Sequence, residues 1–451
     1  MNPGAERAVV VGGGLAGTTA ALALADRGWD VTLLESRSRL GGAAYSFDRD
    51  GLTADTGQHV LLRCYDRYRA LLDRLGMASH ARLQDRMDIP VLDATGRVRR
   101  LRRAGRGPAP LHLLPALLGY SALTVPERMR VARAMAALRR VDHTAPRVDA
   151  ETFGGWLRRH GQGRAETEAL WGLLTVAALN LEVEEASLAL AAHVFRTALL
   201  EDPAAADIAI LDVPLSAVHD RATRDALDRA GVHWHVRERV AAVDRGAAGF
   251  TVRTAAGEVP ADAVVVAVPH RPAARLVPEE ACPDRATWEG LGSAPIVNVH
   301  VHYDRAVTDL PFGAVLGSPV PWFFDRTAAA GCAGQYLTVS ISGADAAVEQ
   351  PAERLLEQHL SALSRLFPAA RTARVLDAFV TREPRATFRQ RAGTAVLRPP
   401  ARTALPGLVL AGAWTATGWP DTLEGAVRSG HLAADCLGSP DRRTERSVMA
   451  R

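Results

Sequence analysis

Near its N-terminus the chain alternates apolar runs with small residues in the order expected of strand, turn, helix and strand. The apolar run of residues 8–11 predicts a buried parallel strand, and the residues after the next turn predict a helix that ends near Arg27. A second strand over residues 30–34 then leads to Glu35. This order is typical of the first half of a nucleotide-binding βαβ unit.

A similar pattern returns at the other end of the chain, after a long intervening region. Residues 65–230 are mostly helical in pattern, and residues 231–270 predict successive strands that end in an apolar one at 263–268. Further strands are expected at 296–303, 322–324 and 336–342, and a helix at 352–366. Residues 405–437 predict a second strand, glycine turn and helix, and this helix begins near Thr422.

The first turn carries Gly12, Gly14 and Gly17 in the GxGxxG spacing of a dinucleotide site. Gly12 permits the tight turn, Gly14 lets the backbone approach a pyrophosphate, and Gly17 permits close packing of helix on strand. Glu35 stands where a carboxylate accepts hydrogen bonds from the ribose hydroxyls of an adenosine. These features predict a dinucleotide site, but they do not distinguish NAD from FAD.

The C-terminal turn favours FAD. A second helix N-terminus directed at the cofactor is superfluous for NAD, whereas it suits a flavin, whose N1/C2=O edge becomes negative on reduction. Small residues on the first turns of this helix, Gly425, Ala426, Ser429 and Gly430, would let it lie close to a flat ligand.

The fold class expected is therefore α/β, with a Rossmann-type FAD-binding domain and an interleaved substrate domain of helices and a mixed β-sheet. At 451 residues the chain is long enough for two domains. The predicted FAD-binding domain comprises residues 1–80, 226–285 and 391–438, and the predicted substrate domain comprises 81–225 and 286–390. The charged tail 439–451 is expected to be disordered.

Composition narrows the function. The net charge of +4 is small for this length, and the arginines are not interleaved with aromatic residues, so a nucleic-acid partner is not expected. The four cysteines have no metal-ligand spacing, so no metal is expected, and they suit reduced thiols in a cytoplasmic protein: Cys64, Cys282, Cys332 and Cys436. No apolar signal stretch precedes the first strand, so export is not expected.

No stretch has the roughly twenty apolar residues of a transmembrane helix, and residues 111–125 come closest but are interrupted by Pro115 and Gly119. Arginines flank this segment on both sides within residues 101–140. This composition suits peripheral contact with the anionic inner face of the cytoplasmic membrane. A helical core segment with a solvated arginine face explains the pattern equally well.

Several motifs together resemble the FAD-dependent amine oxidase and phytoene desaturase superfamily: VVVGGGLAGTTAALALADRGWDVTLLES, LGGAAYS, DTGQHVLL, ERVAAV and LAGAWTATGWPDTLEGAVRSG. Within it, DTGQHVLLRCYDRY, AALNLEVEEAS, APIVNVHVHYDRAV and WTATGWPDTLEGAVRSG resemble the hydroxysqualene dehydroxylases. The resemblance implies reductive removal of the hydroxyl of hydroxysqualene to give squalene in a hopanoid or related triterpene route. It further implies a lipophilic isoprenoid substrate, a separate flavin reductant and squalene synthase-like partner enzymes.

The resemblance also implies which residues contact the cofactor. The pyrophosphate would lie on Gly12, Gly14, Leu15, Ala16 and Gly17, the adenosine on Glu35 and Val240, and the ribityl chain and flavin on Gly41, Gly42, Gly57, Gly412, Trp414, Thr415, Thr422 and Leu423. The sequence departs from the superfamily at two places. Ala43 stands where an arginine is common, and Ala413 stands where an aspartate commonly anchors the cofactor.

The implied chemistry needs few polar side chains. Loss of an allylic hydroxyl leaves a cation that hydride quenches, so the protein must supply an apolar tunnel, orientation and one acid. Gln58 and His59 are the candidates for the proton donor or hydroxyl-binding pair, although a backbone-bonded structural histidine is the more common case. Asp421 and Glu424 are further candidates, and helix capping would also explain both.

Two other functions remain open at this level. A carotenoid or squalene desaturase would use the same architecture in the opposite redox direction. A non-catalytic protein that carries flavin and a prenyl lipid would share the same motifs.

Overall fold

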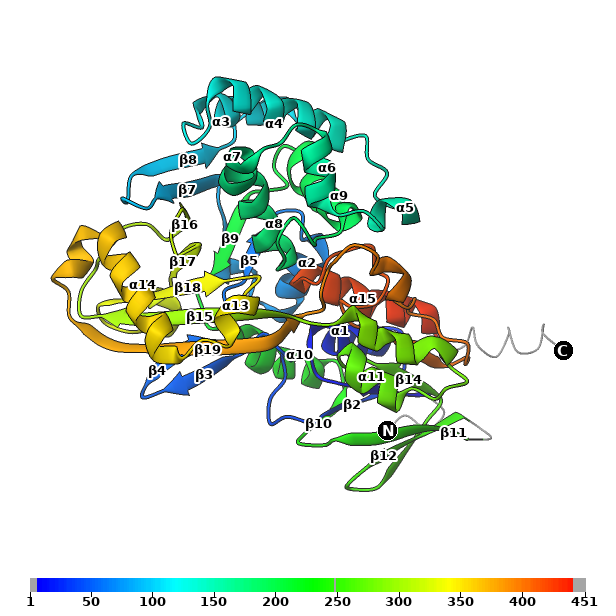
Figure 1. The fold of residues 1–451 in the computed structure, drawn as a ribbon. Coiled ribbons are helices and arrows are strands. Elements are labelled where there is room, and N and C mark those ends of the chain that lie inside the picture. The colour runs from blue at the N-terminus through cyan, green and yellow to red at the C-terminus, as the bar shows by residue number, and fades with distance from the viewer. Residues whose placement is uncertain (1–5, 247–248, 441–451) are drawn as a thin grey trace.

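The structure is a computed structural model that describes residues 6–246 and 249–440 (Figure 1). A five-stranded sheet contains the strands of the nucleotide-binding pattern, and every neighbouring pair in it is parallel. Its strands, in spatial order, are β10 (His233–Val236), β2 (Asp30–Glu35), β1 (Arg7–Val11), β14 (Ala263–Val266) and β20 (Leu408–Leu410). Because these strands are parallel, the loops after β1, β2 and β20 meet at one edge of the sheet.

Two helices that begin at this edge pack directly against each other. They are α1 (Leu15–Ala25) and α15 (Leu423–Leu437). A Cβ built on Gly430 would lie 2.4 Å from the carbonyl oxygen of Ala16, so only glycine allows this approach. Helices α1 and α15, the first and last helices of the described residues, therefore hold the two predicted cofactor turns side by side.

A seven-stranded mixed sheet lies beside the first one (Figure 1). Its strands, in spatial order, are β19 (Val375–Thr387), β15 (Ala294–Tyr303), β18 (Gln335–Ile341), β17 (Trp322–Asp325), β16 (Phe312–Leu316), β7 (Asp88–Asp93) and β8 (Val98–Arg102). The expectation of a mostly helical region over 65–230 is wrong for residues 81–102, which form strands. Arginines on the exposed side of β8 conceal its period-two pattern, in which Leu101 is the buried residue.

Smaller sheets and helices complete the fold. The remaining strands are β3 (Ser46–Arg49) with β4 (Leu52–Asp55); β5 (Val60–Leu62), β9 (Ile208–Leu211) and β6 (Ala81–Leu83); and β11 (Val240–Gly246), β12 (Gly249–Thr254) and β13 (Glu258–Ala261). The other α-helices are α2 (Asp66–Leu75), α3 (Leu114–Gly119), α4 (Val125–Leu138), α5 (Pro146–Asp149), α6 (Phe153–Arg159), α7 (Arg164–Glu166), α8 (Gly172–Leu179), α9 (Leu188–Phe195), α10 (Thr223–Arg229), α11 (His270–Leu276), α12 (Thr327–Ala330), α13 (Asp345–Val348) and α14 (Ala352–Leu366).

The α/β fold class is confirmed. The strands of the five-stranded sheet come from three separated segments of the chain, as an interleaved nucleotide-binding domain requires. The domain boundaries themselves stay a prediction, and the tail predicted to be disordered lies, from residue 441 onward, outside the described residues. Within the described part of the chain, no helix combines the length and apolar character needed to cross a membrane.

Candidate functional site

The first glycine-rich turn leaves an open cradle at the start of α1. Gly12 has a φ of 107°, and a Cβ there would lie 2.6 Å from the carbonyl oxygen of Ala267, so glycine is required. Gly14 is the N-cap residue of α1 and no side chain caps the helix. The N–H groups of Leu15 and Ala16, in the first turn, therefore remain available to an anion that binds at the helix N-terminus.

Glu35 ends β2 next to this turn and is buried. Its Oε2 accepts a hydrogen bond from the backbone N–H of Gly13 at 2.7 Å, and its Oε1 accepts one from the N–H of Arg37 at 2.7 Å. These bonds hold the carboxylate at the sheet edge, with lone pairs left for ribose hydroxyls. Val240 begins β11, two residues after Glu238, whose N–H donates to the carbonyl of Glu35 at 2.8 Å.

The second glycine loop touches the first. The N–H of Gly41 donates to the carbonyl of Gly13 at 2.9 Å, and a Cβ on Gly42 would lie 3.1 Å from Cα of Gly14. Both loops line one cavity. The cavity wall also carries Ala43, one of the two positions at which the sequence departs from the pattern that the resemblance implies. The guanidinium of Arg39 lies nearby, donates to the carbonyl of Gly42 at 2.9 Å and covers the ring of Tyr45.

The C-terminal turn follows β20. The N–H of Gly412 donates to Oγ of Ser429 at 2.8 Å. The indole of Trp414 donates to the carbonyl of Val268 at 3.0 Å and packs on Trp288, and the hydroxyl of Thr415 donates to the carbonyl of Gly412. The side chains of Trp414 and Thr415 thus stabilise the turn, and any contact they make with a cofactor would come from their backbone.

The start of α15 does reach the cavity. Thr422 is its N-cap, accepting from the N–H of Gly425 at 3.1 Å, and Thr422, Leu423 and Ala426 line the cavity. The other small residues of α15 have a different use from the one expected. Gly430 packs on α1, Ser429 binds Gly412, and a Cβ on Gly425 would meet the carbonyl of Pro420 at 2.4 Å. They shape the protein around the turn and do not line the cavity.

Arg398 is a residue of this turn that the sequence analysis missed. It is buried, and its guanidinium donates to the carbonyls of Ala413 at 2.9 Å, Thr415 at 3.0 Å and Trp419 at 2.8 Å. Burial lowers its pKa to about 10. No local motif marks such a residue, because its partners are carbonyl groups 15 to 21 positions away.

The cavity has a volume of about 470 Å³ and two chemically different ends. At one end the cofactor loops meet polar side chains, which include Gln58, His59, Asn180, Ser340, Glu383, Thr387 and Asp421. The other end is apolar and is lined by residues that include Ile89, Leu101, Leu113, Ala116, Leu117, Met135, Leu170, Leu174, Phe195, Phe312, Trp322 and Phe324.

Gln58 and His59 lie together on the polar wall, directly after Gly57, which also lines the cavity. Nδ1 of His59 is 3.2 Å from the carbonyl oxygen of Gly57. Burial lowers the pKa of His59, an effect that Asp55 opposes and Arg326 reinforces. The side-chain amide nitrogen of Gln58 is buried and has no hydrogen-bond partner among the described residues.

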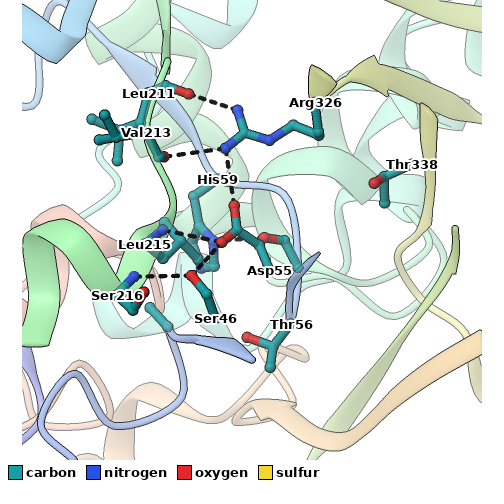
Figure 2. Close-up of polar contacts among 12 residues, drawn as sticks. Ser46, Asp55, Thr56, His59, Leu211, Val213, Leu215, Ser216, Arg326 and Thr338 are labelled. Carbon is teal, nitrogen blue, oxygen red and sulfur yellow. Dashed lines mark hydrogen bonds and ion pairs between the residues drawn. The ribbon is translucent and has the colours of Figure 1, made fainter. Parts of the chain in front are cut away.

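A buried ion pair fixes the chain immediately before these residues, as Figure 2 shows. Oδ2 of Asp55 accepts from Arg326 at 2.9 Å, and Oδ1 accepts from the hydroxyl of Ser46 at 2.6 Å and the N–H of Leu215 at 3.0 Å. Arg326 also donates to the carbonyl of Leu211 at 2.6 Å. The pair ties the end of β4 to β9 and β17 and thereby positions His59.

The two acidic candidates at the start of α15, Asp421 just before the helix and Glu424 in its first turn, have different surroundings. Asp421 lines the cavity, accepts from the N–H of Phe388 at 2.9 Å through Oδ2, and has its pKa raised to about 6 by burial. Glu424 instead caps the start of α2, where it accepts from the N–H of Tyr68 at 2.8 Å, and it pairs with Arg428. Glu424 is therefore structural, and Asp421 is the group in the site.

Glu383 is a further carboxyl on the polar wall that the sequence analysis missed. Burial raises its pKa. It is part of β19, and its strand position gave no signal of chemistry. In the described residues no group of three or more His, Cys, Asp or Glu side chains could hold a metal ion.

These observations fit an FAD. The open N-terminus of α1, the carboxylate of Glu35 and the contact of two glycine loops provide for a dinucleotide, and the N-terminus of α15 faces the cavity beside them. The individual contacts of Gly12, Gly57, Val240, Gly412 and the other residues named above with the cofactor stay predictions.

Comparisons with known proteins agree with this geometry. A family model described as flavin-containing amine oxidoreductase matches residues 15–438. A hydroxysqualene dehydroxylase of Rhodopseudomonas palustris is 31% identical over 435 residues, which cover 95% of this chain and 97% of the relative. A zeta-carotene desaturase of Arabidopsis thaliana is 24% identical over 487 residues, which cover 96% of this chain and 85% of the relative.

The fold is also that of a solved oxidoreductase from Methanosarcina mazei. The TM-score is 0.74 at 16% identity, and the match covers 95% of this chain and all of the other, 100%. The chain therefore belongs to the flavin-containing amine oxidoreductase family and is an FAD-dependent oxidoreductase.

Proposed function

We propose that this enzyme removes the hydroxyl of hydroxysqualene reductively and releases squalene. The observation that carries the proposal is the cavity, whose lining combines many apolar side chains with a few polar ones beside the cofactor loops. The name and near full-length coverage of the Rhodopseudomonas relative support the same substrate.

The apolar end binds the hydrocarbon chain and excludes water. Its aliphatic and aromatic side chains, such as Leu113, Leu117 and Phe195, present no hydrogen-bonding group to the hydrocarbon of the substrate. Burial of apolar surface contributes roughly 25 cal/mol per Å² to binding. Exclusion of water also protects the allylic cation from capture by solvent.

The polar end binds the hydroxyl and supplies its proton. The unpartnered amide nitrogen of Gln58 is a hydrogen-bond donor for the hydroxyl oxygen. Burial lowers the pKa of His59, so its ring is mostly unprotonated near neutral pH and would orient the hydroxyl in its neutral form without supplying the proton. Asp421 is the better acid, since its raised pKa keeps part of it protonated near neutrality.

The C–O bond breaks with its electron pair on oxygen, and the proton of Asp421 converts the leaving hydroxyl to water. Reduced FAD, when bound, supplies the hydride that the allylic carbon accepts. Asp421 recovers its proton from solvent, and an external reductant must restore the electrons.

Anaerobic reoxidation tests the proposal. The holoenzyme is reduced with a stoichiometric amount of dithionite, and hydroxysqualene or squalene is added. Hydroxysqualene should restore the yellow flavin spectrum and give squalene by mass spectrometry, whereas squalene should change nothing. A flavin that stays bleached with hydroxysqualene rejects the proposed reaction.

A polyene desaturase is the second candidate, and the match to a zeta-carotene desaturase along 96% of the chain favours it. A desaturase withdraws hydride from its substrate, so the oxidised holoenzyme should bleach anaerobically when a more saturated polyene is added. The flavin absorbance therefore separates the candidates: a dehydroxylase reoxidises its reduced flavin with hydroxysqualene, and a desaturase reduces its oxidised flavin with the polyene.

The cellular setting is also part of the proposal. The protein would work in the cytoplasm at the inner face of the cytoplasmic membrane, in a hopanoid or related triterpene route. Squalene synthase-like enzymes would supply the hydroxylated substrate, and a separate reductase would reduce the flavin.

A further inference from the structure

Exposed apolar side chains gather on one short part of the chain. Among the described residues, half of the large apolar side chains that are exposed lie between positions 111 and 129: Leu111, Leu114, Leu118, Val125 and Met129. Leu118 is 60% exposed and Val125 is 66% exposed. Single exposed leucines are ordinary, but such a cluster marks an interaction surface.

The cluster lies on α3, on the short helical turn η2 (Leu111–Leu113) before it, and on the start of α4. Leu111, Leu114 and Leu118 are spaced three and four residues apart, so they share one face. Leu113, Ala116 and Leu117 occupy the opposite face and line the apolar end of the cavity. This helical segment is therefore apolar on both sides, one toward the cavity and one toward solvent.

The surroundings of the cluster are cationic. Glu127 is the single acidic residue of positions 97–140, and its carboxylate accepts from the N–H of Thr124 in the capping box of α4. Several arginines nearby are paired, as Arg100 is with Asp88. Among the described residues, no ion pair or hydrogen bond involves the exposed side chains of Arg106 and Arg133, and both remain available to an anionic partner.

We propose that this α3–α4 surface, comprising Leu111, Leu114, Leu118, Val125, Met129, Arg106 and Arg133, docks on an anionic lipid bilayer. Leucines would enter the interfacial region while the arginines contact lipid phosphates. Figure 1 shows α3 and α4 at the outer margin of the molecule, away from the five-stranded sheet. A second copy of the chain fits poorly, because two such surfaces would bring like charges together.

The apolar part of the cavity lies next to the docking surface, because residues of the same helical segment line it. Since α3 separates the docked surface from the apolar end of the cavity, a lipophilic substrate would pass from the bilayer to the cavity beside α3 without crossing water. This part of the inference rests on the proposed function, whereas docking itself does not.

Vesicle sedimentation with the holoenzyme tests the docking. The vesicles are phosphatidylcholine alone or phosphatidylcholine with phosphatidylglycerol, and no substrate is present. Binding should require phosphatidylglycerol and weaken with salt. The double variant Leu114→Ser, Leu118→Ser should bind about tenfold less tightly, since it removes apolar area without disturbing the core. The double variant Arg106→Glu, Arg133→Glu should lose most of the binding that depends on phosphatidylglycerol.

The matched control is Leu376→Ser, Leu432→Ser, two leucines that are 47% and 41% exposed elsewhere, and it should bind as the wild type does. Wild-type protein that fails to bind, or an α3 variant that binds as the wild type does, overturns the inference. So does a stable dimer that the α3 variant abolishes, which would identify a second copy as the partner. Turnover of detergent-dispersed hydroxysqualene by the α3 variant would show that the proposed reaction stands independently of the docking.

Discussion

At the scale of single residues, the site depends on which side chains are absent as well as on those present. A Cβ on Gly14 would meet nothing closer than Cα of Gly42 at 3.7 Å, so the protein itself leaves this space open. A Cβ on Gly17, by contrast, would lie 1.9 Å from the carbonyl oxygen of Gly12. Gly17 therefore serves the fold, whereas the open space at Gly14 is where we expect the pyrophosphate to bind.

Gly14→Val tests this distinction. The φ of Gly14 is −75°, which valine also adopts, so the variant should fold and lose FAD because its side chain occupies the pyrophosphate space. The flavin-to-protein ratio after gel filtration measures the loss, and circular dichroism checks the fold. Full flavin occupancy in Gly14→Val would remove the first turn from the cofactor site.

Asp421 determines the expected pH dependence. Because burial raises its pKa to about 6, its protonated fraction falls as pH rises through that value. The rate of substrate-dependent flavin reoxidation should fall with it, while Asp421→Asn should be slower by about 10² or more and show no such transition. Stopped-flow measurements from pH 5 to pH 8 compare the two profiles.

Stability supplies an independent check on Asp421. A carboxyl with a raised pKa in the folded state favours folding at low pH, and this contribution is lost as pH rises through about 6. Asp421→Asn should therefore have a higher melting temperature than the wild type at pH 8 and a smaller advantage at pH 5, because the contribution is fully present only below the ordinary aspartate pKa of about 3.9. An equal melting temperature at pH 8 would show that Asp421 is well solvated and thus a weaker candidate for the acid.

At the scale of elements, Arg398 holds the turn between β20 and α15 through carbonyl groups. Arg398→Gln keeps some polarity but cannot reach Ala413, Thr415 and Trp419 together. The free energy of unfolding should fall by about 2–4 kcal/mol, and FAD should bind more weakly because the turn loses its shape. Urea denaturation and flavin titration measure the two effects. Arg402→Gln, at an exposed arginine on the approach to β20, is the control and should change neither.

The sequence predicts elements well where the determining contacts are local. The β1–α1–β2 unit, Glu35 at its end and the start of α15 at Thr422 follow from glycine spacing, apolar runs and capping residues. Strand β8 was missed because its three arginines outnumber its two apolar residues, and strand β7 was missed because its short apolar run, interrupted by Pro90, shows no alternation with polar residues. Arg398 and the Asp55–Arg326 pair were missed because their partners lie far away in the chain.

At the scale of the whole molecule, the predicted cofactor contacts come from the beginning and the end of the chain. A ligand that bridges them stabilises only the folded state, so FAD at about one hundred times its Kd should add about 2.7 kcal/mol to stability. Thermal unfolding of the apoprotein with increasing FAD measures this stabilisation. Adenosine diphosphate at the same concentration would reach only the first turn and should therefore stabilise the protein less. Equal shifts with both ligands would contradict the contribution of the C-terminal turn.

The contact of α1 with α15 through Gly430 has a consequence for biosynthesis. The ribosome makes α15 about 400 residues after the first cofactor turn, so the nascent chain presents that turn alone until residues 423–437 have been translated. We therefore expect flavin to bind both turns only after residues 423–437 have been synthesised. A nonsense mutation before residue 423 would leave a polypeptide that has the GxGxxG turn but lacks the helix that packs on it.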